Sequence, residues 1–317
     1  MALVALKRGI RLPGGGAGRL LLPLERMQEL ISKADALLEA LPYLQRFRGA
    51  TFVVKYGGSF MDSPGTAGRA GVARDVVFLA AAGIGPVLVH GGGKAVTAAL
   101  ARTGRAPEFL QGMRVTDEAA AQVVERVLSH EINPQIVSTI IGLGGRAKGF
   151  SGTDVFTCRK LWLAGAGGER LDPGWVGEVV AVKTEPLREC VRNGTIPVVS
   201  PTARGQDGRV YNCNADVAAA QAAIALQAQR LVFMSDVPGL LRDPKNPQTL
   251  ISRLSAGEVG GLKKSGVIDQ GMLPKVDSAV AALRAGVGKV SFVDGRVAHA
   301  VLLEMFAGEA PGTQIVL

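Results

Sequence analysis

The sequence has few of the features by which several large protein classes are recognised. Its three cysteines, Cys158, Cys190 and Cys213, do not have the spacing of a metal site and favour a reducing, cytoplasmic location. No apolar run approaches the roughly 18 residues of a membrane span, so we expect no membrane partner. Aromatic residues make up only 5% of the 317 residues and do not interleave with basic ones, which disfavours nucleic acid as a partner.

Two familiar phosphate-binding loops are also absent. Gly93-Lys94 is followed by Ala95, so the Gly-Lys-Ser/Thr of a P-loop is missing. No Gly-x-Gly-x-x-Gly follows a predicted strand, so the fingerprint of a dinucleotide-binding domain is missing too. A Rossmann-type oxidoreductase is therefore disfavoured.

What the chain does have is an excess of positive charge, formally +9. Residues 1–23 hold +4 of it without any acid, and they contain the linker-like run Leu12-Pro-Gly-Gly-Gly-Ala-Gly18. They lack the apolar region and cleavage site of a secretory signal, so we predict a disordered tail. The charge on the remainder of the chain favours small anionic substrates.

Residues 24–47 have the pattern of an amphipathic helix. Apolar residues recur at spacings of three and four, which places them on one helix face. They are Leu24, Met27, Leu30, Ile31, Ala34, Leu37, Leu38 and Leu41. Because an apolar face is costly to expose, this face must pack against the body of the protein or against another subunit.

From residue 51 onward, short β-like runs alternate with helical segments. We predict strands at 52–56, 86–90, 196–200, 230–235 and 289–293, and helices near 71–83, 94–103, 117–142, 184–193, 214–228, 255–265 and 275–285. Single strands separated by helices indicate βαβ crossovers, hence an α/β fold with an open, mostly parallel central sheet and helices on both faces. Turn residues within 146–182 predict hairpins, and a soft domain boundary falls near Pro201-Thr202.

Glycine-rich turns follow the first two predicted strands. One is His90-Gly-Gly-Gly93, and the other is Tyr56-Gly-Gly58, which comes directly after Lys55. Such turns let the backbone approach a ligand and direct N–H groups at negative oxygens. A triple glycine fits a simple tight turn equally well. Two such turns at the carboxyl ends of neighbouring parallel strands would frame one anionic site.

Three polar clusters in the second half also lie at element ends, and each has a purely structural interpretation. Asn214 or Asp216 could cap a helix. Asp236 could form a turn after a strand. Lys275, which follows a proline at a helix start, could simply be solvated.

Taken together, these motifs resemble the N-acetylglutamate kinases of the amino-acid kinase family. They occur in the same order, and the similarity runs from about Ala36 to the C-terminus. The matching motifs are Lys55-Tyr-Gly-Gly58, His90-Gly-Gly-Gly93, Gly112-Met-Arg-Val-Thr-Asp117, Asn212-Cys-Asn-Ala-Asp216, Ser235-Asp-Val-Pro-Gly239 and Gly271-Met-Leu-Pro-Lys275.

The resemblance implies phosphoryl transfer from ATP, with Mg²⁺, to the side-chain carboxylate of N-acetyl-L-glutamate, an early step of arginine biosynthesis. A carboxylate with a reference pKa of about 4.3 is already ionised at pH 7, so no general base is needed. None of His90, His130 and His299 has an evident acidic partner at the sequence spacing of a catalytic triad. The difficulty is repulsion between two anions, which lysines, backbone N–H groups and Mg²⁺ relieve.

The resemblance also implies a role for each matching residue, and no resident metal site. Lys55 and Lys275 would flank the transferred phosphoryl group, and Asp216 would hold both lysines. Arg114 would pair with the α-carboxylate of the acceptor, which Gly92, Gly93 and Asn212 would also contact. The nucleotide would be bound by Gly57, Gly58, Asp236, Val237, Pro238, Gly239, Leu240, Leu241, Val267, Ile268 and Asp269.

Two positions depart from the family pattern on the acceptor side. The triple glycine is followed by Lys94-Ala-Val96, where many members have Pro-Gln/Glu-Ile, and Thr153 stands where a lysine is commoner. They leave open a sister kinase of another amino-acid carboxylate, such as an aminoadipate derivative. A second alternative is a non-catalytic amino-acid or nucleotide sensor, although a sensor need not keep both phosphoryl-stabilising lysines.

The resemblance further implies an organisation into parts. Residues 24–50 would be an N-terminal oligomerisation helix, 51–200 an acetylglutamate-binding and dimerisation lobe, and 201–317 an ATP-binding lobe. In relatives that arginine inhibits, a similar helix joins dimers into a hexameric ring, and arginine binds beside it. We therefore expect a homo-oligomer, a dimer-based hexamer, with arginine as inhibitor and Glu304 pairing with its guanidinium.

Overall fold

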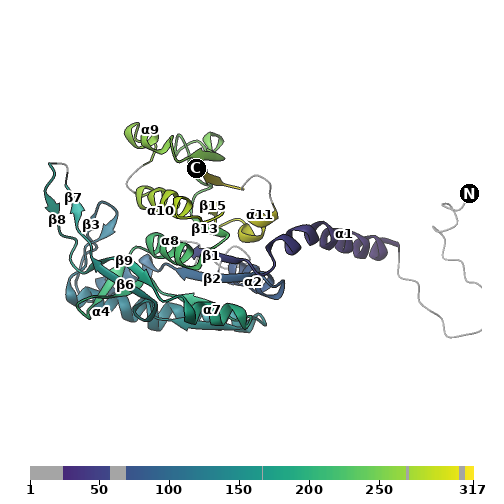
Figure 1. Ribbon diagram of the computed structural model, residues 1–317, viewed down its shortest axis with the longest axis horizontal. Helices are drawn as coiled ribbons and strands as arrows, with labels where there is room; N and C mark the ends of the chain where they lie inside the picture. The colour runs from purple at the N-terminus through teal and green to yellow at the C-terminus, as the bar shows by residue number, and fades with distance from the viewer. Residues whose placement is uncertain (1–23, 58–68, 166, 269–270, 307–310) are drawn as a thin grey trace, which may run out of the picture. The chain divides into compact units, whose positions relative to one another are not determined.

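The computed structural model describes residues 24–57, 69–165, 167–268, 271–306 and 311–317. The predicted tail lies outside these residues. The chain divides into two compact units, Met1–Pro42 and Tyr43–Leu317. The described part of the first unit belongs to helix α1, Leu24–Phe47, which confirms the predicted helix (Figure 1).

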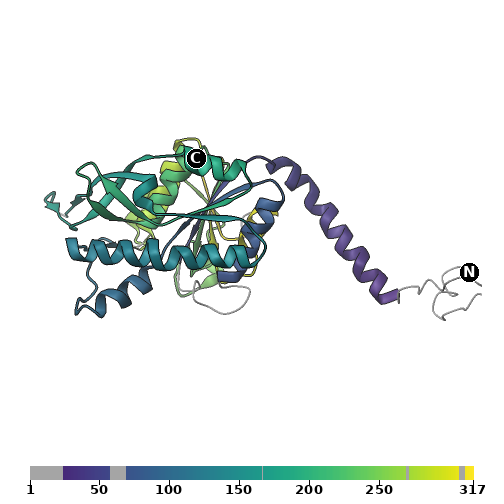
Figure 2. The same cartoon turned by 90° about the horizontal axis from the view of Figure 1, so that it is seen from below.

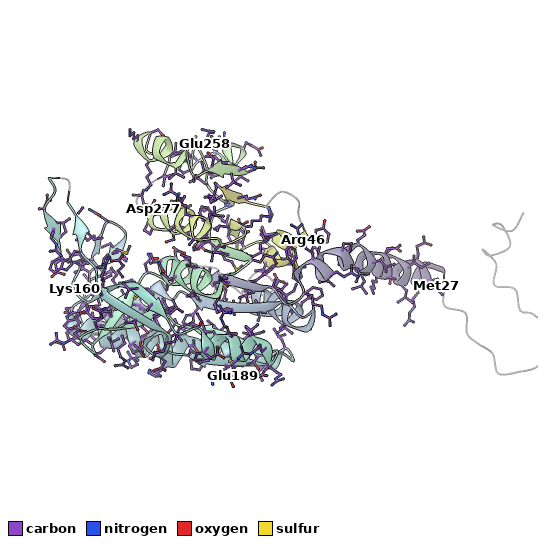
Figure 3. The ribbon with its side chains drawn as sticks, viewed as in Figure 1. Met27, Arg46, Lys160, Glu189, Glu258 and Asp277 are labelled. Atoms are coloured by element: carbon purple, nitrogen blue, oxygen red, sulfur yellow. The ribbon has the colours of Figure 1, made fainter. Side chains whose placement is uncertain are left out.

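Helix α1 carries exposed apolar side chains. Met27, Leu37 and Leu38 are 43%, 64% and 66% exposed, and Met27 projects from the helix in Figure 3. The last turn differs, because Phe47 is buried and packs edge-on against Phe52 of the first strand. The end of α1 is thus part of the hydrophobic core of the second unit.

Within the described residues, eight strands of the second unit form one open sheet. All neighbouring strands are parallel except one pair, β15 and β16. The predicted mostly parallel sheet and its five predicted strands are therefore confirmed. The order across the sheet is β14 (Arg253–Ser255), β16 (Thr313–Val316), β15 (Val290–Asp294), β13 (Arg230–Ser235), β1 (Thr51–Tyr56), β2 (Gly85–His90), β10 (Ile196–Val199) and β5 (Ala147–Phe150).

Helices cover both faces of this sheet, as Figure 1 and Figure 2 show. Two separate clusters of buried apolar residues, one on each face, form the core. One face holds α7 (Glu185–Arg192), α8 (Ala215–Leu226) and α10 (Leu273–Arg284). The other face holds α2 (Arg69–Ala81), α5 (Asn133–Gly142) and α11 (Ala300–Phe306).

Strand β1 shows how the sequence directs side chains to each face. Its residues alternate, so that Phe52 and Val54 belong to the core cluster of α2, whereas Val53 belongs to that of α8. Lys55 follows Val53 by two residues and therefore points to the same face as Val53. This parity brings the predicted catalytic lysine to the side of α8 and α10.

The predicted hairpin region, residues 146–182, contributes to more than hairpins. Its first strand, β5, joins the edge of the main sheet in parallel. A true hairpin forms between β7 (Leu163–Ala164) and β8 (Arg170–Leu171). A small closed barrel, which the sequence did not predict, consists of β6 (Phe156–Lys160), β9 (Val176–Val182), β11 (Thr202–Gly205) and β12 (Val210–Cys213).

The predicted helix at 117–142 is continuous but not uniform. It begins as α4 (Glu118–Glu125), becomes π-helical over Arg126–Ile132 and ends as α5. A π-helical turn is wider than an α-helical one, so it rotates the side chains that follow relative to those before it. This segment faces the turn after β2, as the site geometry shows below.

The remaining elements are short. They are α3 (Gly93–Ala101), the hairpin of β3 (Phe109–Leu110) and β4 (Met113–Arg114), α6 (Gly152–Val155), the 3₁₀ turn Pro247–Thr249 and α9 (Val259–Lys264). The helix predicted at 255–265 starts later than expected, because residues 253–255 form the edge strand β14. None of the helices that the structure describes combines the length and apolarity needed to cross a membrane.

Candidate active site

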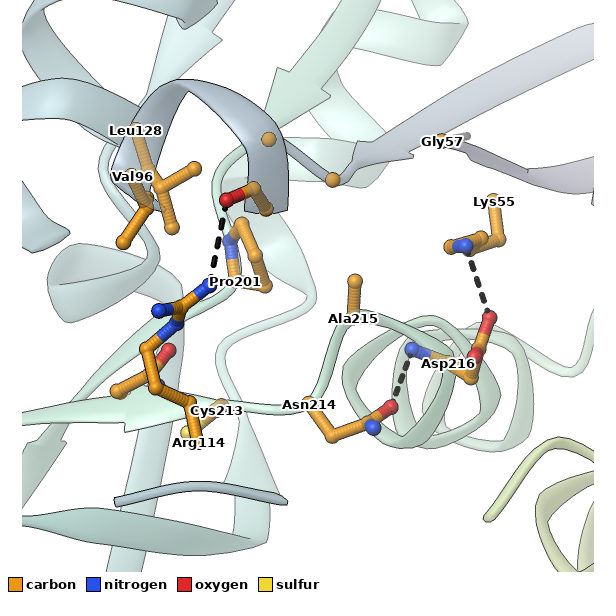
Figure 4. Close-up of a pocket in the computed structure, with 14 residues that line it drawn as sticks. Lys55, Gly57, Val96, Arg114, Leu128, Pro201, Cys213, Asn214, Ala215 and Asp216 are labelled. Carbon is orange, nitrogen blue, oxygen red and sulfur yellow. Dashed lines mark hydrogen bonds and ion pairs between the residues drawn. The ribbon is translucent and has the colours of Figure 1, made fainter. Parts of the chain in front are cut away.

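The carboxyl ends of β1 and β2 border a cavity of about 250 Å³ (Figure 4). Lys55 and Gly57 come from the end of β1, and the triple glycine 91–93 comes from the turn after β2. Because β1 and β2 pair in parallel, the two glycine turns lie side by side, as the sequence predicted. Gly58 lies outside the described residues.

Lys55, Lys275 and Asp216 form an ion cluster at this cavity. The Nζ atoms of Lys55 and Lys275 each lie 3.1 Å from Oδ1 of Asp216. All three side chains are largely buried, with exposures of 12%, 8% and 13% respectively. Lys55 and Asp216 line the cavity, and Lys275 reaches Asp216 from the first turn of α10.

Burial and charge act against each other in this cluster. Burial raises the pKa of Asp216, but the attraction of Lys55 and Lys275 outweighs it and lowers that pKa to about 2. Burial lowers the pKa of Lys275, the charge of Lys55 lowers it further, and Asp216 opposes both. Asp216 is therefore a carboxylate at neutral pH, and the cluster has two lysines for one carboxylate, an arrangement suited to binding an anion.

Asn214 fixes the position of Asp216. Its Oδ1 accepts hydrogen bonds from the backbone N–H groups of Asp216, at 2.8 Å, and Val217, at 3.2 Å, which makes Asn214 the N-cap of α8. Of the two candidate caps in the sequence, Asn214 has this role, and the carboxylate of Asp216 is left to bind the lysines. The N-terminus of α8 also favours a negative charge at Asp216.

Gly92 is required by a close contact with the π-helical segment. A Cβ atom at Gly92 would lie 2.5 Å from Cδ1 of Ile132 and 2.5 Å from Cδ2 of Leu128. A Cβ atom at Gly93, by contrast, would have nothing within 4 Å among the described residues. The missing side chain at Gly92 thus lets the π-helical segment reach the cavity, which Leu128 lines.

Arg114 enters the cavity from β4. Its Nη2 donates to Oγ1 of Thr97 at 2.7 Å and to the carbonyl of Gly93 at 3.2 Å. Its guanidinium carbon lies 4.7 Å from the ring centre of Phe109. Its Nη1 is buried without a hydrogen-bond partner among the described residues, and burial lowers the pKa of Arg114. A buried N–H with no acceptor in the protein is suited to a ligand carboxylate.

Asn212 lies on β12 and lines the same cavity. Its Nδ2 donates to Oγ1 of Thr116 at 3.3 Å. The small barrel therefore contributes a wall of the site, although the sequence did not predict the barrel. The cavity brings together these predicted residues: Lys55, Gly57, Gly92, Gly93, Arg114, Asn212 and Asp216.

Of the predicted nucleotide residues that the structure describes, Gly57 lines this cavity, whereas residues 236–241, 267 and 268 do not. Residues 236–241 follow β13, which pairs with β1 on the side opposite to β2. Asp236 is close enough to Lys275 for its charge to act on that lysine. Val237 is 38% exposed. The loop after β13 and the ion cluster are thus neighbours, as expected for parallel strands.

The inner part of this loop is held by the C-terminal strand. A Cβ atom at Gly239 would lie 2.6 Å from Oγ1 of Thr313, and that oxygen accepts the N–H of Leu240 at 2.7 Å. Leu240 and Leu241 are buried, so their side chains anchor this loop to the core. Of the second predicted nucleotide stretch, Val267 is half-buried and Ile268 is buried, and Asp269 lies outside the described residues.

A second cavity, of about 290 Å³, lies beside the last turn of α1. Its walls carry positive charge from Arg46, Arg230 and Lys289. Glu304 on α11 is fully buried next to these residues, and its Oε1 accepts from Lys289 at 2.8 Å. Its Oε2 is buried without a hydrogen-bond partner among the described residues, 3.9 Å from Nε of Arg230.

One histidine has an acidic partner that the sequence did not reveal. His299 does have an acidic partner, because its Nδ1 lies 2.7 Å from Oδ1 of the buried Asp75. The two residues are too far apart in the chain for spacing to reveal this pair. The Nε2 of His130 lies 4.0 Å from Oε1 of Glu125. Neither histidine lines the cavity at β1 and β2.

Sequence reasoning missed two threonines that hydrogen-bond to Arg114 and Asn212. Thr97 follows Gly93 by four residues on α3, so helical spacing could have placed it on the same helix face as Gly93, a predicted site residue. Thr116 lies inside the quoted motif 112–117, but nothing in the sequence indicates that its hydroxyl meets Asn212, which comes from a strand of the unpredicted barrel.

Comparison with known proteins gives matches over most of the chain. Residues 50–294 match the profile of the amino acid kinase family. The acetylglutamate kinase of Heliobacterium modesticaldum is 43% identical over 296 residues, which are 92% of this chain and 100% of that protein. The acetylglutamate kinase of Methanocaldococcus jannaschii is 44% identical over 295 residues, 91% of this chain and 98% of that protein.

A similar solved structure is the N-acetylglutamate synthase of Neisseria gonorrhoeae. Its complex with coenzyme A and N-acetyl-glutamate is 28% identical, with a TM-score of 0.75, over 90% of this chain and 63% of that one. Its complex with coenzyme A and L-arginine has a TM-score of 0.71 over 88% of this chain and 64% of that one. This chain thus spans less than two thirds of the synthase.

Proposed function

The chain belongs to the acetylglutamate kinases of the amino acid kinase family, phosphotransferases with a carboxyl group as acceptor, and we propose that its reaction takes place at the cavity between β1 and β2. The acceptor is the side-chain carboxylate of N-acetyl-L-glutamate, and the product is its acyl phosphate, in arginine biosynthesis. The observation that carries this proposal is the buried cluster in which Lys55 and Lys275 share one oxygen of Asp216.

The reaction joins two anions, and this cluster supplies the opposing charge. An oxygen of the acceptor carboxylate attacks the γ-phosphorus of ATP, the new O–P bond forms, and ADP leaves with the electron pair of the broken bond. No proton moves, because the carboxylate is already ionised at pH 7. Lys55 and Lys275 flank the transferred group and stabilise its charge, while Asp216 keeps the two ammonium groups together.

The acceptor is held on the side of α3 and β12. The buried, unpartnered Nη1 of Arg114 binds the α-carboxylate of the acceptor. Gly92 and Gly93 let the acceptor approach the backbone, and Asn212 contacts it from the barrel. Thr97 keeps the guanidinium of Arg114 in this orientation through its 2.7 Å hydrogen bond.

The nucleotide occupies the neighbouring edge of the sheet. Gly57 and Gly58 donate N–H groups to phosphates of ATP, and the loop 236–241 with residues 267–269 holds the remainder of the nucleotide. Among the described residues, no group of three or more His, Cys, Asp or Glu side chains could hold a metal ion. In this proposal Mg²⁺ enters with ATP, bound mainly by phosphate oxygens and water. We propose 51–200 as the acceptor-binding and dimerisation lobe and 201–317 as the ATP-binding lobe, with Asn212 and the Gly57-Gly58 turn contributing across this boundary.

The test is an acceptor panel with purified protein, ATP and Mg²⁺. The acyl phosphate is trapped with hydroxylamine, and the hydroxamate is measured with N-acetyl-L-glutamate, L-glutamate and N-acetyl-L-aminoadipate. We expect product with N-acetyl-L-glutamate and far less with the other two. Preference for the aminoadipate derivative would favour the sister kinase. ATP or amino-acid binding without product from any acceptor would favour the sensor.

The enzyme also forms a homo-oligomer in this proposal. Strand β5 is an edge strand of the main sheet, and the adjacent α5 exposes Ile141 by 54%. An open edge beside an exposed apolar side chain is suited to pairing with a second copy. The exposed apolar residues of α1 would then join such dimers, which gives a dimer-based hexamer.

Feedback inhibition by arginine would use the cavity at the last turn of α1. The buried Oε2 of Glu304 has no hydrogen-bond partner in the described part of the chain, so it can accept from the guanidinium of arginine. Arg46 and Lys289 supply positive charge for its carboxylate. The cavity includes the end of α1, so an arginine bound there would act on the helix rather than compete with the acceptor. A cytoplasmic location stays a prediction from the three free cysteines.

A further inference from the structure

Thr116 joins the two residues that hold the acceptor, although it does not line the cavity itself. Its side chain is completely buried. Its backbone N–H donates to the carbonyl of Pro173 at 2.9 Å, and its carbonyl accepts from the N–H of Trp175 at 2.6 Å. The turn between them must pass close by, since a Cβ atom at Gly174 would lie 2.2 Å from the carbonyl oxygen of Thr116. The backbone of Thr116 is thus fixed on both sides.

The hydroxyl of Thr116 has a single proton, and one hydrogen bond in the structure uses it. Oγ1 donates to the backbone carbonyl of Arg114 at 2.8 Å. A carbonyl can only accept, so this hydrogen bond uses the hydroxyl proton. The same oxygen also lies 3.3 Å from the side-chain amide of Asn212. Toward Asn212 the hydroxyl can therefore only accept, and Asn212 must present its NH₂ group to it.

This chain of hydrogen bonds fixes which atom Asn212 offers to the cavity. A side-chain amide has its oxygen and nitrogen on opposite sides, so turning the NH₂ group to Thr116 turns Oδ1 away from it. The strand cannot move to change this, because the backbone N–H of Asn212 donates to the carbonyl of Trp175 at 3.0 Å. Among the described residues, none donates a hydrogen bond to Oδ1 of Asn212.

The acceptor side of the cavity therefore has one unpaired acceptor atom and one unpaired cationic donor. The acceptor atom is Oδ1 of Asn212, and the donor is the buried Nη1 of Arg114. An N-acylated α-amino acid carries the matching pair on one carbon atom, an amide N–H and a carboxylate. An ester in place of the amide has no N–H, so it would leave the oxygen of Asn212 facing another oxygen.

We propose that Thr116 is a positioning residue that orients Asn212 to accept the amide N–H of the acceptor, and so selects N-acylated substrates over their ester analogues. The inference rests on the proposed function, since it assumes that acetylglutamate binds at this cavity. Thr116 acts through Asn212 and through the backbone of Arg114, without touching the substrate.

The experiment compares two acceptors in the full-length enzyme. One is N-acetyl-L-glutamate, and the other is the O-acetyl ester of 2-hydroxyglutarate, in which the N–H is replaced by oxygen. We expect the wild-type enzyme to prefer the amide in kcat/KM by about tenfold or more, because the ester leaves a cavity acceptor unpaired. In Thr116→Val, the KM for acetylglutamate should rise about tenfold with the KM for ATP unchanged.

The decisive quantity is the preference between the two acceptors in the variant. Without the hydroxyl, Asn212 can turn its NH₂ group toward the ester, so the amide preference should shrink to near unity in Thr116→Val and return in Thr116→Ser. Thr139→Val is the matched control. It also removes a hydroxyl that bonds a backbone carbonyl, that of Gln135 at 2.8 Å, but Gln135 does not line the cavity, whereas Arg114 and Asn212 do. The Thr139→Val variant should therefore keep the preference.

Two outcomes would overturn the inference while the proposed function stands. One is an unchanged amide preference in Thr116→Val, and the other is an equal rise in KM for acetylglutamate and ATP, which a purely structural threonine would give. If Thr116→Val does not fold, Thr116→Cys carries the same expectation, because a thiol is a weak hydrogen-bonding group. A wild-type enzyme that phosphorylates neither acceptor would instead contradict the proposed function.

Discussion

Lys55 on β1 and Lys275 on α10 share a single carboxylate oxygen, Oδ1 of Asp216, at equal distances of 3.1 Å. Two ammonium groups on one oxygen are held by a partner that can neutralise only one of them. This arrangement keeps positive charge in reserve within a largely buried site. A phosphoryl group that enters between the lysines would attract both ammonium groups and offset the repulsion between them. The ammonium groups are already in position before this group binds.

The first prediction concerns these two lysines. Lys55→Ala and Lys275→Ala should each lower kcat by about 10²-fold or more, because each removes charge stabilisation from the transition state. Steady-state kinetics with ATP and acetylglutamate measures this. Lys263→Ala is the control, since Lys263 also pairs with an aspartate, Asp277, but on the surface, where such a pair contributes little. Near-normal turnover in Lys55→Ala or Lys275→Ala would remove that lysine from the mechanism.

The second prediction is a pH dependence that follows from Lys275. Burial lowers its pKa below the ordinary value of 10.5, and the charge of Lys55 lowers it further. Because the protonated lysine is needed, kcat/KM should fall as the pH rises through this lowered pKa, on the alkaline side of the profile. Lys275→Arg should move that decline to higher pH, since a guanidinium does not lose its proton in this range.

A variant of Asp216 gives a second test of this pH dependence of kcat/KM. The carboxylate opposes the lowering of the Lys275 pKa, so Asp216→Asn should move the alkaline decline to still lower pH. The overall rate should drop as well, because the lysines lose their common partner. An alkaline decline that stays in place in both Lys275→Arg and Asp216→Asn would show that another group controls it.

The sequence predicted the part of the site at the ends of β1 and β2 better than the parts contributed by the barrel and the π-helical segment. Strands β1 and β2 are apolar runs that end in glycines, and the carboxyl ends of neighbouring parallel strands must meet, so Lys55 and the triple glycine could be placed together. Asp216 and Lys275 were assigned by resemblance of their motifs. Their meeting at one oxygen depends on how α8 and α10 pack on the sheet, which periodicity does not specify.

The barrel and the π-helical segment contribute to the site through contacts that no local sequence pattern predicts. The barrel that carries Asn212 includes strands such as Phe156–Lys160 and Thr202–Gly205, which mix polar, charged and small residues and lack the apolar run that marks β1 and β2. The π-helical turn reads as ordinary amphipathic helix in the sequence, yet its Leu128 and Ile132 determine why residue 92 must be glycine. The hydrogen bond between Asn212 and Thr116 is a further contact that the sequence did not predict.

The third prediction concerns Arg114. Its Nη1 is buried without a partner in the described part of the chain, so a bound carboxylate would satisfy it. Arg114→Ala should raise the KM for acetylglutamate far more than the KM for ATP, and Arg114→Lys should restore binding only in part, because an ammonium cannot form two parallel hydrogen bonds. Equal changes in both KM values would assign Arg114 to the structure of the β3–β4 hairpin instead.

The last prediction separates regulation from catalysis at the boundary between the two units. Phe47 is 1% exposed and packs on Phe52. A truncation from the N-terminus should therefore end before Phe47, so that this core contact is kept. Deleting residues 1–42 keeps the compact unit from Tyr43 onward intact but removes the exposed apolar residues of α1. We expect light scattering to show a dimer in place of a hexamer, with kcat near that of the full chain and with inhibition by millimolar arginine lost.

A point variant distinguishes assembly from effector binding. Glu304→Gln keeps the size of the side chain and an oxygen for Lys289, but it removes the carboxylate that would pair with the guanidinium of arginine. It should stay hexameric and active while the concentration of arginine for half inhibition rises by about tenfold or more, because a charge-assisted hydrogen bond is replaced by a neutral one. A truncated enzyme that remains hexameric would refute the role of α1. Unchanged inhibition in Glu304→Gln would place the arginine site elsewhere, and full-length enzyme that ignores millimolar arginine would refute the regulatory proposal as a whole.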